Sequence, residues 1–118
     1  MPLIKKVQKG LAWTLYSALP VRNNKVVVTS FYGRGYSDNP KAIVDELLTR
    51  DAGLDIVWLA KDPDHAGVPQ GVRVVRYDTP AAIRELSTAR VWVDNCRKGA
   101  RRKKSGQYYM QTWHGFAL

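Results

Sequence analysis

The fold is decided by residues 26–41, which run Val26-Val27-Val28-Thr29-Ser30-Phe31-Tyr32-Gly33-Arg34-Gly35-Tyr36-Ser37-Asp38-Asn39-Pro40-Lys41. The β-branched residues at the start of this stretch are typical of a buried strand, and the glycines in its middle indicate a loop. Asn39 and Pro40 are residue types favoured at a helix N-cap and at the first helical position. The stretch therefore predicts a strand, a loop and a helix, in that order.

The same alternation continues along the chain. Further strands are predicted over residues 55–60, 72–77, 90–95 and 107–113, and helices over 41–50 and after Thr79-Pro80. Strands that alternate with helices of about ten residues predict an α/β fold with a Rossmann-like parallel sheet and right-handed crossovers. Strand 72–77 is expected at an edge of the sheet, because Arg73 and Arg76 alternate with apolar positions.

Residues 1–24 predict an amphipathic basic helix ahead of the domain formed by residues 25–118. At 100° per residue one side of this helix collects the apolar residues Leu3, Ile4, Val7, Leu11, Leu15 and Ala18. The opposite side carries Lys5, Lys6 and Lys9. The longest charge-free stretch, residues 10–21, has 12 residues, fewer than the roughly 20 needed to span a bilayer. Three interpretations remain open: a helix on a membrane surface, a helix packed on its own or another domain, and a signal peptide.

Length and charge narrow the function classes. With 118 residues the chain forms one domain, and its net charge of +9 comes from two segments without acids, residues 1–25 and 97–104. The rest of the chain carries 8 basic and 10 acidic residues, so these two segments are expected to face an anionic partner or water. The single cysteine, Cys96, excludes an internal disulfide and a zinc site built from cysteines. No metal or cofactor is expected. NAD binding is discounted because Asp38 replaces the third glycine of the dinucleotide fingerprint.

The candidate site lies where the predicted strands end. The loop 31–39, residues 94–97 and His114-Gly115 all follow strands, and the carboxyl ends of parallel strands meet at one edge of a sheet. His114 is the strongest candidate for a general base, because an imidazole takes up a proton near neutral pH. A histidine that caps a helix or lies in the core is the alternative. His65, in a Pro/Gly loop, is expected to be solvated.

Two loops at this edge are candidates for anion binding. The Gly33-Arg34-Gly35 loop precedes a helix N-terminus and predicts a phosphate or polyol contact, with a structural turn as the alternative. The second is the acid-free segment 97–104, called the basic loop below. It predicts capture of a polyanion or of lipid headgroups through Arg101, Arg102, Lys103 and Lys104. A solvated loop and a nucleic-acid contact are the alternatives, and the second is disfavoured by poor aromatic interleaving.

These residues also carry a resemblance to a known family. Residues 28–41, Ile56-Val57-Trp58, residues 92–97 and residues 107–115 resemble, in order and spacing, the CDP-glycerol glycerophosphotransferase family of teichoic acid biosynthesis. The resemblance covers residues 25–118. Its most specific parts are Ser30-Phe31-Tyr32-Gly33 with Tyr36-Ser37-Asp38-Asn39-Pro40, and the ending Gln111-Thr112-Trp113-His114-Gly115.

The resemblance implies the amino-terminal domain of a GT-B-like architecture, truncated before the donor-nucleotide domain and inactive by itself. The family transfers glycerol phosphate from CDP-glycerol to a poly(glycerol phosphate) chain or lipid-linked primer and releases CMP, at the cytoplasmic face of the cell membrane. His114 matches the family's proposed general base. By the same resemblance the acceptor side is lined by Gly33, Tyr36, Asp38, Asn39, Asn95 and Arg97. Arg34 and Gly35, from the loop predicted to bind phosphate or polyol, complete the predicted substrate-binding set. Lys5, Lys6 and Lys9 would join the basic loop as polymer or lipid contacts.

Two other functions stay open at this point. One is a stand-alone module that binds anionic lipid or polymer, and the other is a nucleic-acid-binding domain. The near-neutral body of the chain disfavours the second, and no nucleic acid is expected among the partners.

Overall fold

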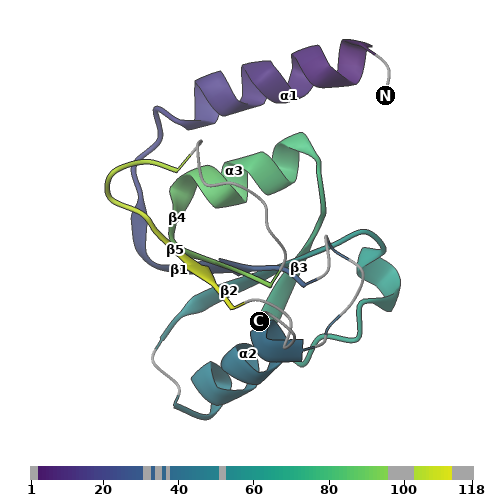
Figure 1. The fold of residues 1–118 in the computed structure, drawn as a ribbon, viewed down its shortest axis with the longest axis vertical. Helices are drawn as coiled ribbons and strands as arrows, with labels where there is room; N and C mark the ends of the chain where they lie inside the picture. Colours follow the sequence, from purple (N-terminus) through teal and green to yellow (C-terminus); the bar gives the residue numbers. More distant parts are fainter. Residues whose placement is uncertain are drawn as a thin grey trace, which may run out of the picture.

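A computed structural model describes residues 3–30, 33, 36, 38–50, 53–95 and 103–112, with the side chain of Asp38 left out. Five strands form one parallel sheet in the order β3-β2-β1-β4-β5 (Figure 1). Their bounds are β1 Arg22–Val28, β2 Asp55–Ala60, β3 Val72–Arg76, β4 Ala89–Asp94 and β5 Tyr108–Gln111. The Rossmann-like parallel sheet predicted from the sequence is therefore confirmed, and β3 lies at an edge as expected.

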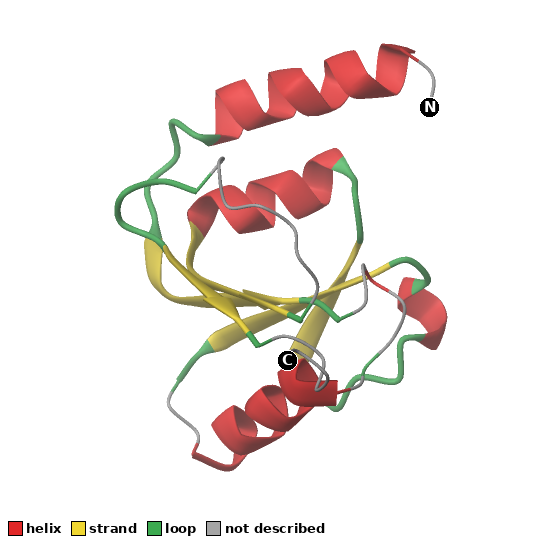
Figure 2. Cartoon of the chain, viewed as in Figure 1, coloured by secondary structure: helices red, strands yellow, loops and turns green. Residues whose placement is uncertain are grey.

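Helices cover both faces of this sheet (Figure 2). The α-helices are α1 Leu3–Tyr16, α2 Asp38–Arg50 and α3 Pro80–Thr88, and a short 3-10 helix, η2, spans Pro63–His65. Helix α2 covers one face, while α3 covers the other and carries α1 on its outer side. The crossover through α2 leads from β1 to β2, and the crossover through α3 leads from β3 to β4, in the opposite direction across the sheet. Because both crossovers are right-handed, the two helices must lie on opposite faces.

Some element boundaries differ from those predicted. Strand β1 begins at Arg22, and α2 begins at Asp38, so Asn39 and Pro40 lie inside its first turn and Asn39 is not the N-cap. The start of α3 is confirmed, since the Thr79 side chain accepts a hydrogen bond from the amide of Ala82 and Pro80 follows it.

The alternation of side chains along β1 and β2 divides the core in two. Val28, Val44 and Trp58 belong to the cluster under α2, whereas Val27, Leu86 and Trp92 belong to the cluster under α3. Successive strand residues point to opposite faces, and both faces are covered at the centre of the sheet, so the central strands carry continuous apolar runs, Val26–Val28 in β1 and Ile56–Ala60 in β2.

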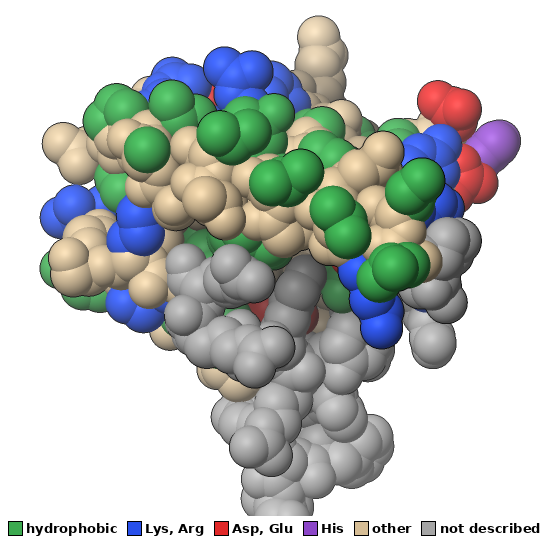
Figure 3. Space-filling view, turned by 90° about the horizontal axis from the view of Figure 1, so that it is seen from above, with side chains coloured by type: hydrophobic (Ala, Val, Ile, Leu, Met, Phe, Trp, Pro, Cys, Tyr) green, Lys and Arg blue, Asp and Glu red, His purple; other side chains and the backbone are tan. Residues whose placement is uncertain are grey.

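Helix α1 keeps its apolar stripe away from the core. Ala12 is its one buried residue, and Trp13 reaches Trp92 with ring centroids 6.2 Å apart. The stripe stays 52–75% exposed at Leu3, Ile4, Val7, Leu11 and Leu15, and forms a row of apolar side chains along the helix (Figure 3). Within the described residues no helix is both long and apolar enough to span a membrane.

Lys25 corrects one expectation. The sequence analysis counted it among the cations expected to face a partner or water. In the structure Lys25 is only 5% exposed, and its Nζ donates to Glu85 at 2.8 Å and to Thr88 at 2.7 Å. Arg73 joins the same network by binding both Asp55 and Glu85. The hydrogen bond from Arg73 holds the pKa of Asp55 below its usual value, although burial opposes this.

Candidate functional site

The carboxyl ends of the strands lie together, as the parallel sheet requires. The ladder between β4 and β5 continues beyond Gln111, because the amide of Thr112 donates to the Asp94 carbonyl at 2.8 Å. Of the predicted site residues, Gly33, Tyr36, Asn39 and Asn95 are described at this edge. Arg34, Gly35, Arg97 and the candidate base His114 lie outside the described residues, as do Arg101, Arg102 and Cys96, and Asp38 is described by its backbone alone.

Gly33 joins the ends of three strands. Its amide donates to the Ser30 carbonyl at 3.0 Å, and its carbonyl accepts from the amide of Lys61 at 2.7 Å. Its φ is +89°, and a Cβ at this position would lie 2.8 Å from Cβ and Cγ of Tyr77. The backbone conformation and the close approach both require glycine here.

Tyr36 is engaged within the fold. Its hydroxyl donates to Asp45 Oδ1 at 2.5 Å, and its ring lies edge-on to Trp58 with centroids 4.7 Å apart. Burial, together with the Asp45 carboxylate, raises the pKa of Tyr36 above its ordinary value. The phenol therefore stays protonated and supports the loop after β1.

Asn95 is fully buried. Its amide nitrogen donates to Ser30 Oγ at 3.1 Å, and both side chains have 0% exposure. This bond ties the end of β4 to the end of β1, where the strand order reverses. Because the Asn95 side chain is buried, a bound ligand could contact it only if the surrounding residues moved.

Among the four predicted site residues that the structure describes in full, Asn39 is the exposed one. Its amide nitrogen lies 3.4 Å from the carbonyl oxygen of Thr112, so the first turn of α2 contacts the chain just after β5. The structure thus brings the loop after β1, the start of α2 and the segment leading to Trp113-His114 to one edge.

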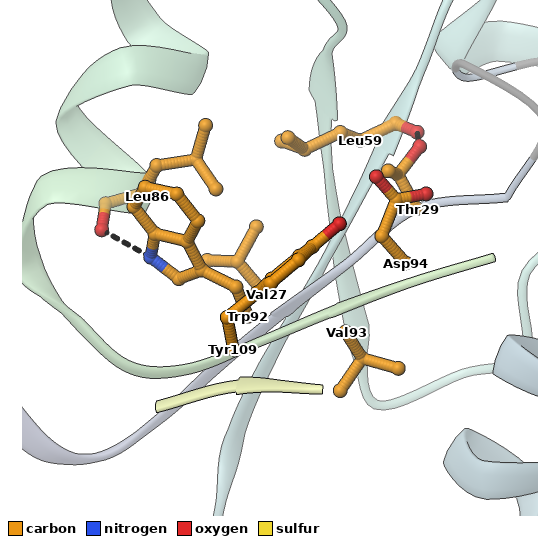
Figure 4. A pocket seen from close by; sticks show the side chains of 8 residues that line it. All are labelled: Val27, Thr29, Leu59, Leu86, Trp92, Val93, Asp94 and Tyr109. Carbon is orange, nitrogen blue, oxygen red and sulfur yellow. Dashed lines mark hydrogen bonds between the residues drawn. The ribbon is translucent and has the colours of Figure 1, made fainter. Parts of the chain in front are cut away.

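On the α3 side of this edge, sequence reasoning included Asp94 in the segment 94–97 but missed two further polar residues, Thr29 and Tyr109. Thr29, Asp94 and Tyr109 lie at one end of a largely apolar cavity whose other walls include Leu86 and Trp92 (Figure 4). The cavity itself is only about 20 Å³, roughly the space of one water molecule, and is far smaller than pockets that hold drug-sized ligands. Asp94 is 3% exposed. Its position at the end of a predicted strand was the available signal.

The basic residues have unequal roles. Lys5 and Lys6 are exposed, whereas Lys9 forms an ion pair with Asp78 at 3.0 Å. Lys104 Nζ donates to the carbonyls of Ser17 and Leu19, just after α1, and burial lowers its pKa.

The end of the basic loop is also fixed to the body of the domain. Lys103 Nζ donates to the Gln107 carbonyl at 2.8 Å. The Gln107 side chain is buried, and its amide donates to the carbonyls of Leu86 and Ala89. Of the four loop cations predicted to bind an anionic partner, the two that the structure describes, Lys103 and Lys104, therefore also bond within the domain. Among the described residues no group of His, Cys, Asp and Glu could hold a metal ion.

A family model described as CDP-glycerol:poly(glycerophosphate) glycerophosphotransferase matches residues 11–118. A teichoic acid poly(glycerol phosphate) polymerase from Staphylococcus epidermidis is 34% identical over 99 residues, 83% of this chain and 14% of the polymerase. A teichoic acid glycerol-phosphate transferase from Staphylococcus aureus is 32% identical over 119 residues, 98% of this chain and 30% of the transferase.

Solved structures agree with the sequence comparison. A structure of the wall teichoic acid polymerase TagF superimposes with a TM-score of 0.80 at 32% identity, over 95% of this chain and 29% of TagF. A TagF variant soaked with CDPG gives a TM-score of 0.81 at 31% identity, again over 95% of this chain and 29% of that one. The chain thus spans about a third or less of the relatives it matches.

Proposed function

Because the chain belongs to the CDP-glycerol:poly(glycerophosphate) glycerophosphotransferase family, we propose that it is the amino-terminal, acceptor-side part of such an enzyme. The whole enzyme would transfer glycerol phosphate from CDP-glycerol to a teichoic acid chain or its lipid-linked primer and release CMP. The observation that carries this proposal is the match of nearly the whole chain, in sequence and in fold, to teichoic acid polymerases and transferases. The donor would bind to a second Rossmann-like domain in a GT-B-like arrangement.

The chemistry assigns a role to His114. A terminal hydroxyl of the acceptor attacks the β-phosphorus of CDP-glycerol, the new P–O bond forms, and the bond to the CMP oxygen breaks. The hydroxyl proton must leave as the nucleophile adds, and a histidine base near neutral pH accepts it. The ends of β1, β4 and β5 would hold the acceptor beside this base, supported by the Gly33 turn and the bond between Ser30 and Asn95.

Extending the chain with the coding sequence that follows Leu118 tests this function. We expect the extended protein to release CMP from CDP-glycerol in the presence of a glycerol phosphate acceptor, and residues 1–118 alone to release none. CMP is measured by chromatography, with an acceptor-free reaction as the control. A well-folded extended protein that released no CMP would contradict the proposal.

The exposed stripe of α1 supports a peripheral position on the cytoplasmic face of the membrane. Five apolar side chains face outward, and Lys5 and Lys6, outside the apolar stripe, are also exposed. An amphipathic helix of this composition lies in the headgroup region, where apolar burial and attraction to anionic lipids both contribute. A lipid-linked acceptor would be met at this surface.

Vesicle binding should depend on this stripe. Leu11→Gln with Leu15→Gln is expected to lower binding to phosphatidylglycerol-containing vesicles about tenfold or more, because two apolar side chains no longer enter the headgroup region. Both side chains are exposed, so the stability of the domain should not change. Co-sedimentation measures the effect.

The matched control is Tyr108→Gln with Met110→Gln, which removes two exposed apolar side chains from β5. We expect this control to bind vesicles like the parent chain. Equal loss of binding in both variants would argue against α1 as the contact.

The exposed stripe also favours a second candidate, a stand-alone module that binds anionic lipid or polymer. This module would bind vesicles as predicted, yet its extended form would release no CMP. The two assays together therefore separate the candidates.

A further inference from the structure

The exposed cations Lys61 and Arg76 lie at the carboxyl end of the sheet, on the side of β2 and β3. Lys61 directly follows β2, and Arg76 ends β3, where it is the register partner of Ala60. Arg76 Nη1 donates to the Lys61 carbonyl at 2.8 Å, so its guanidinium is held beside the end of β2. Both residues therefore face the edge at which parallel α/β sheets bind their ligands.

Neither cation is neutralised within the described part of the chain. All ion pairs there involve other residues, including Arg73, which lies on the same strand as Arg76 and binds two carboxylates. Nearby acids are engaged elsewhere, since Asp62 binds His65 and Asp78 binds Lys9. Asp64 forms no ion pair with either cation.

The backbone around this pair is fixed. The amide of Lys61 donates to the Gly33 carbonyl at 2.7 Å, and the amide of Tyr77, next to Arg76, donates to the Ala60 carbonyl at 2.8 Å. Adjacent strands are about 4.8 Å apart, so the ends of β2 and β3 lie about 5 to 10 Å from the end of β1, where the strand order reverses. A polymer bound at that reversal would have a second phosphate within reach of the pair.

We propose that Lys61 and Arg76 form a subsite for a phosphodiester of the acceptor polymer, away from its reacting end. An arginine already held by one hydrogen bond offers its remaining donors to phosphate oxygens, and the lysine adds a mobile positive charge. This inference rests on the proposed function for the identity of the polymer. It assigns part of the anion binding to β2 and β3, whereas the sequence directed attention to residues 97–104.

The test is the binding of a short synthetic oligomer of glycerol phosphate to residues 1–118, measured by titration calorimetry. Lys61→Glu with Arg76→Glu is expected to weaken binding about tenfold, a modest loss because both contacts are solvent-exposed. The control, Arg50→Glu with Arg84→Glu, changes the net charge equally on exposed helix positions and should leave affinity within about twofold. Circular dichroism verifies that both variants are folded.

Two further probes separate other sources of phosphate. Inorganic phosphate at the same phosphate concentration should compete poorly with the oligomer, and phosphatidylglycerol vesicles should bind the Lys61/Arg76 variant as they bind the parent. Three results would each overturn the subsite. They are equal weakening of oligomer binding in the site and control variants, full competition by inorganic phosphate, and a Lys61/Arg76 variant that loses vesicle binding but keeps oligomer binding. These assays measure binding and need no turnover. An extended chain that released no CMP would therefore contradict the proposed function, whereas the binding of the oligomer at Lys61 and Arg76 would still be tested on its own.

Discussion

Replacing His114 with alanine in the extended protein is expected to slow CMP release by about a hundredfold to ten-thousandfold. This is the range that general bases contribute when they accept a proton in the transition state. Without the imidazole, the acceptor hydroxyl must lose its proton to water. The rate is measured by CMP release with both substrates saturating, so that a change in binding does not mask a change in turnover.

The pH profile adds a second measurement. An imidazole must be unprotonated to act as a base, so the parent rate should rise with pH as this histidine loses its proton. The alanine variant should lose this rise. The exposed His65, whose Nδ1 lies 2.9 Å from Asp62 Oδ2, provides the matched control: His65→Ala should keep both the rate and the profile. Full activity in His114→Ala would remove the proposed role of this residue.

Gly33→Ala is expected to destabilise the domain by about 3 kcal/mol. Part of this cost comes from the left-handed backbone conformation at φ +89°. An L-residue with a Cβ adopts this conformation at a free-energy cost of about 1–2 kcal/mol. The rest is overlap, since the new Cβ would lie 2.8 Å from Tyr77 and 3.1 Å from the backbone nitrogen of Lys61, and such overpacking costs about 1–3 kcal/mol. Urea unfolding followed by circular dichroism measures the change.

Gly67 isolates the conformational contribution. Its φ is +72°, and nothing lies within 4 Å of a Cβ built on it. Gly67→Ala should therefore lose only the conformational part, about 1–2 kcal/mol. If the two variants were equally stable, the close packing of Gly33 against Tyr77 would not contribute, and the turn would not be the fixed support described above.

Much of the candidate site could be located from the sequence. The rule that carboxyl ends of parallel strands meet predicted one edge for Gly33, Asn39 and Asn95, and the structure shows their segments in contact there. Their part in binding stays a prediction. Their individual roles could not be predicted. The bond from Asn95 to Ser30 joins residues 65 positions apart, and only the pairing of β1 with β4 brings them together.

The N-terminal segment illustrates the same division. Its 3.6-residue periodicity predicted an amphipathic helix, and α1 is present over Leu3–Tyr16. Periodicity identifies an apolar face but not what covers it. In the structure Ala12 and Trp13 contact the domain, and the apolar stripe faces outward.

The sequence by itself determined the order and type of the elements and the parallel sheet, because local periodicity and the length of each crossover allow few other arrangements. Tertiary structure alone decided which polar groups support the edge and which cations remain available to a ligand. Lys25 and Arg76 are both basic residues on strands, yet one is buried against Glu85 and the other is exposed without an ion pair in the described part of the chain. The physical reason is that burial and ion pairing depend on neighbours from distant segments, which no local pattern encodes.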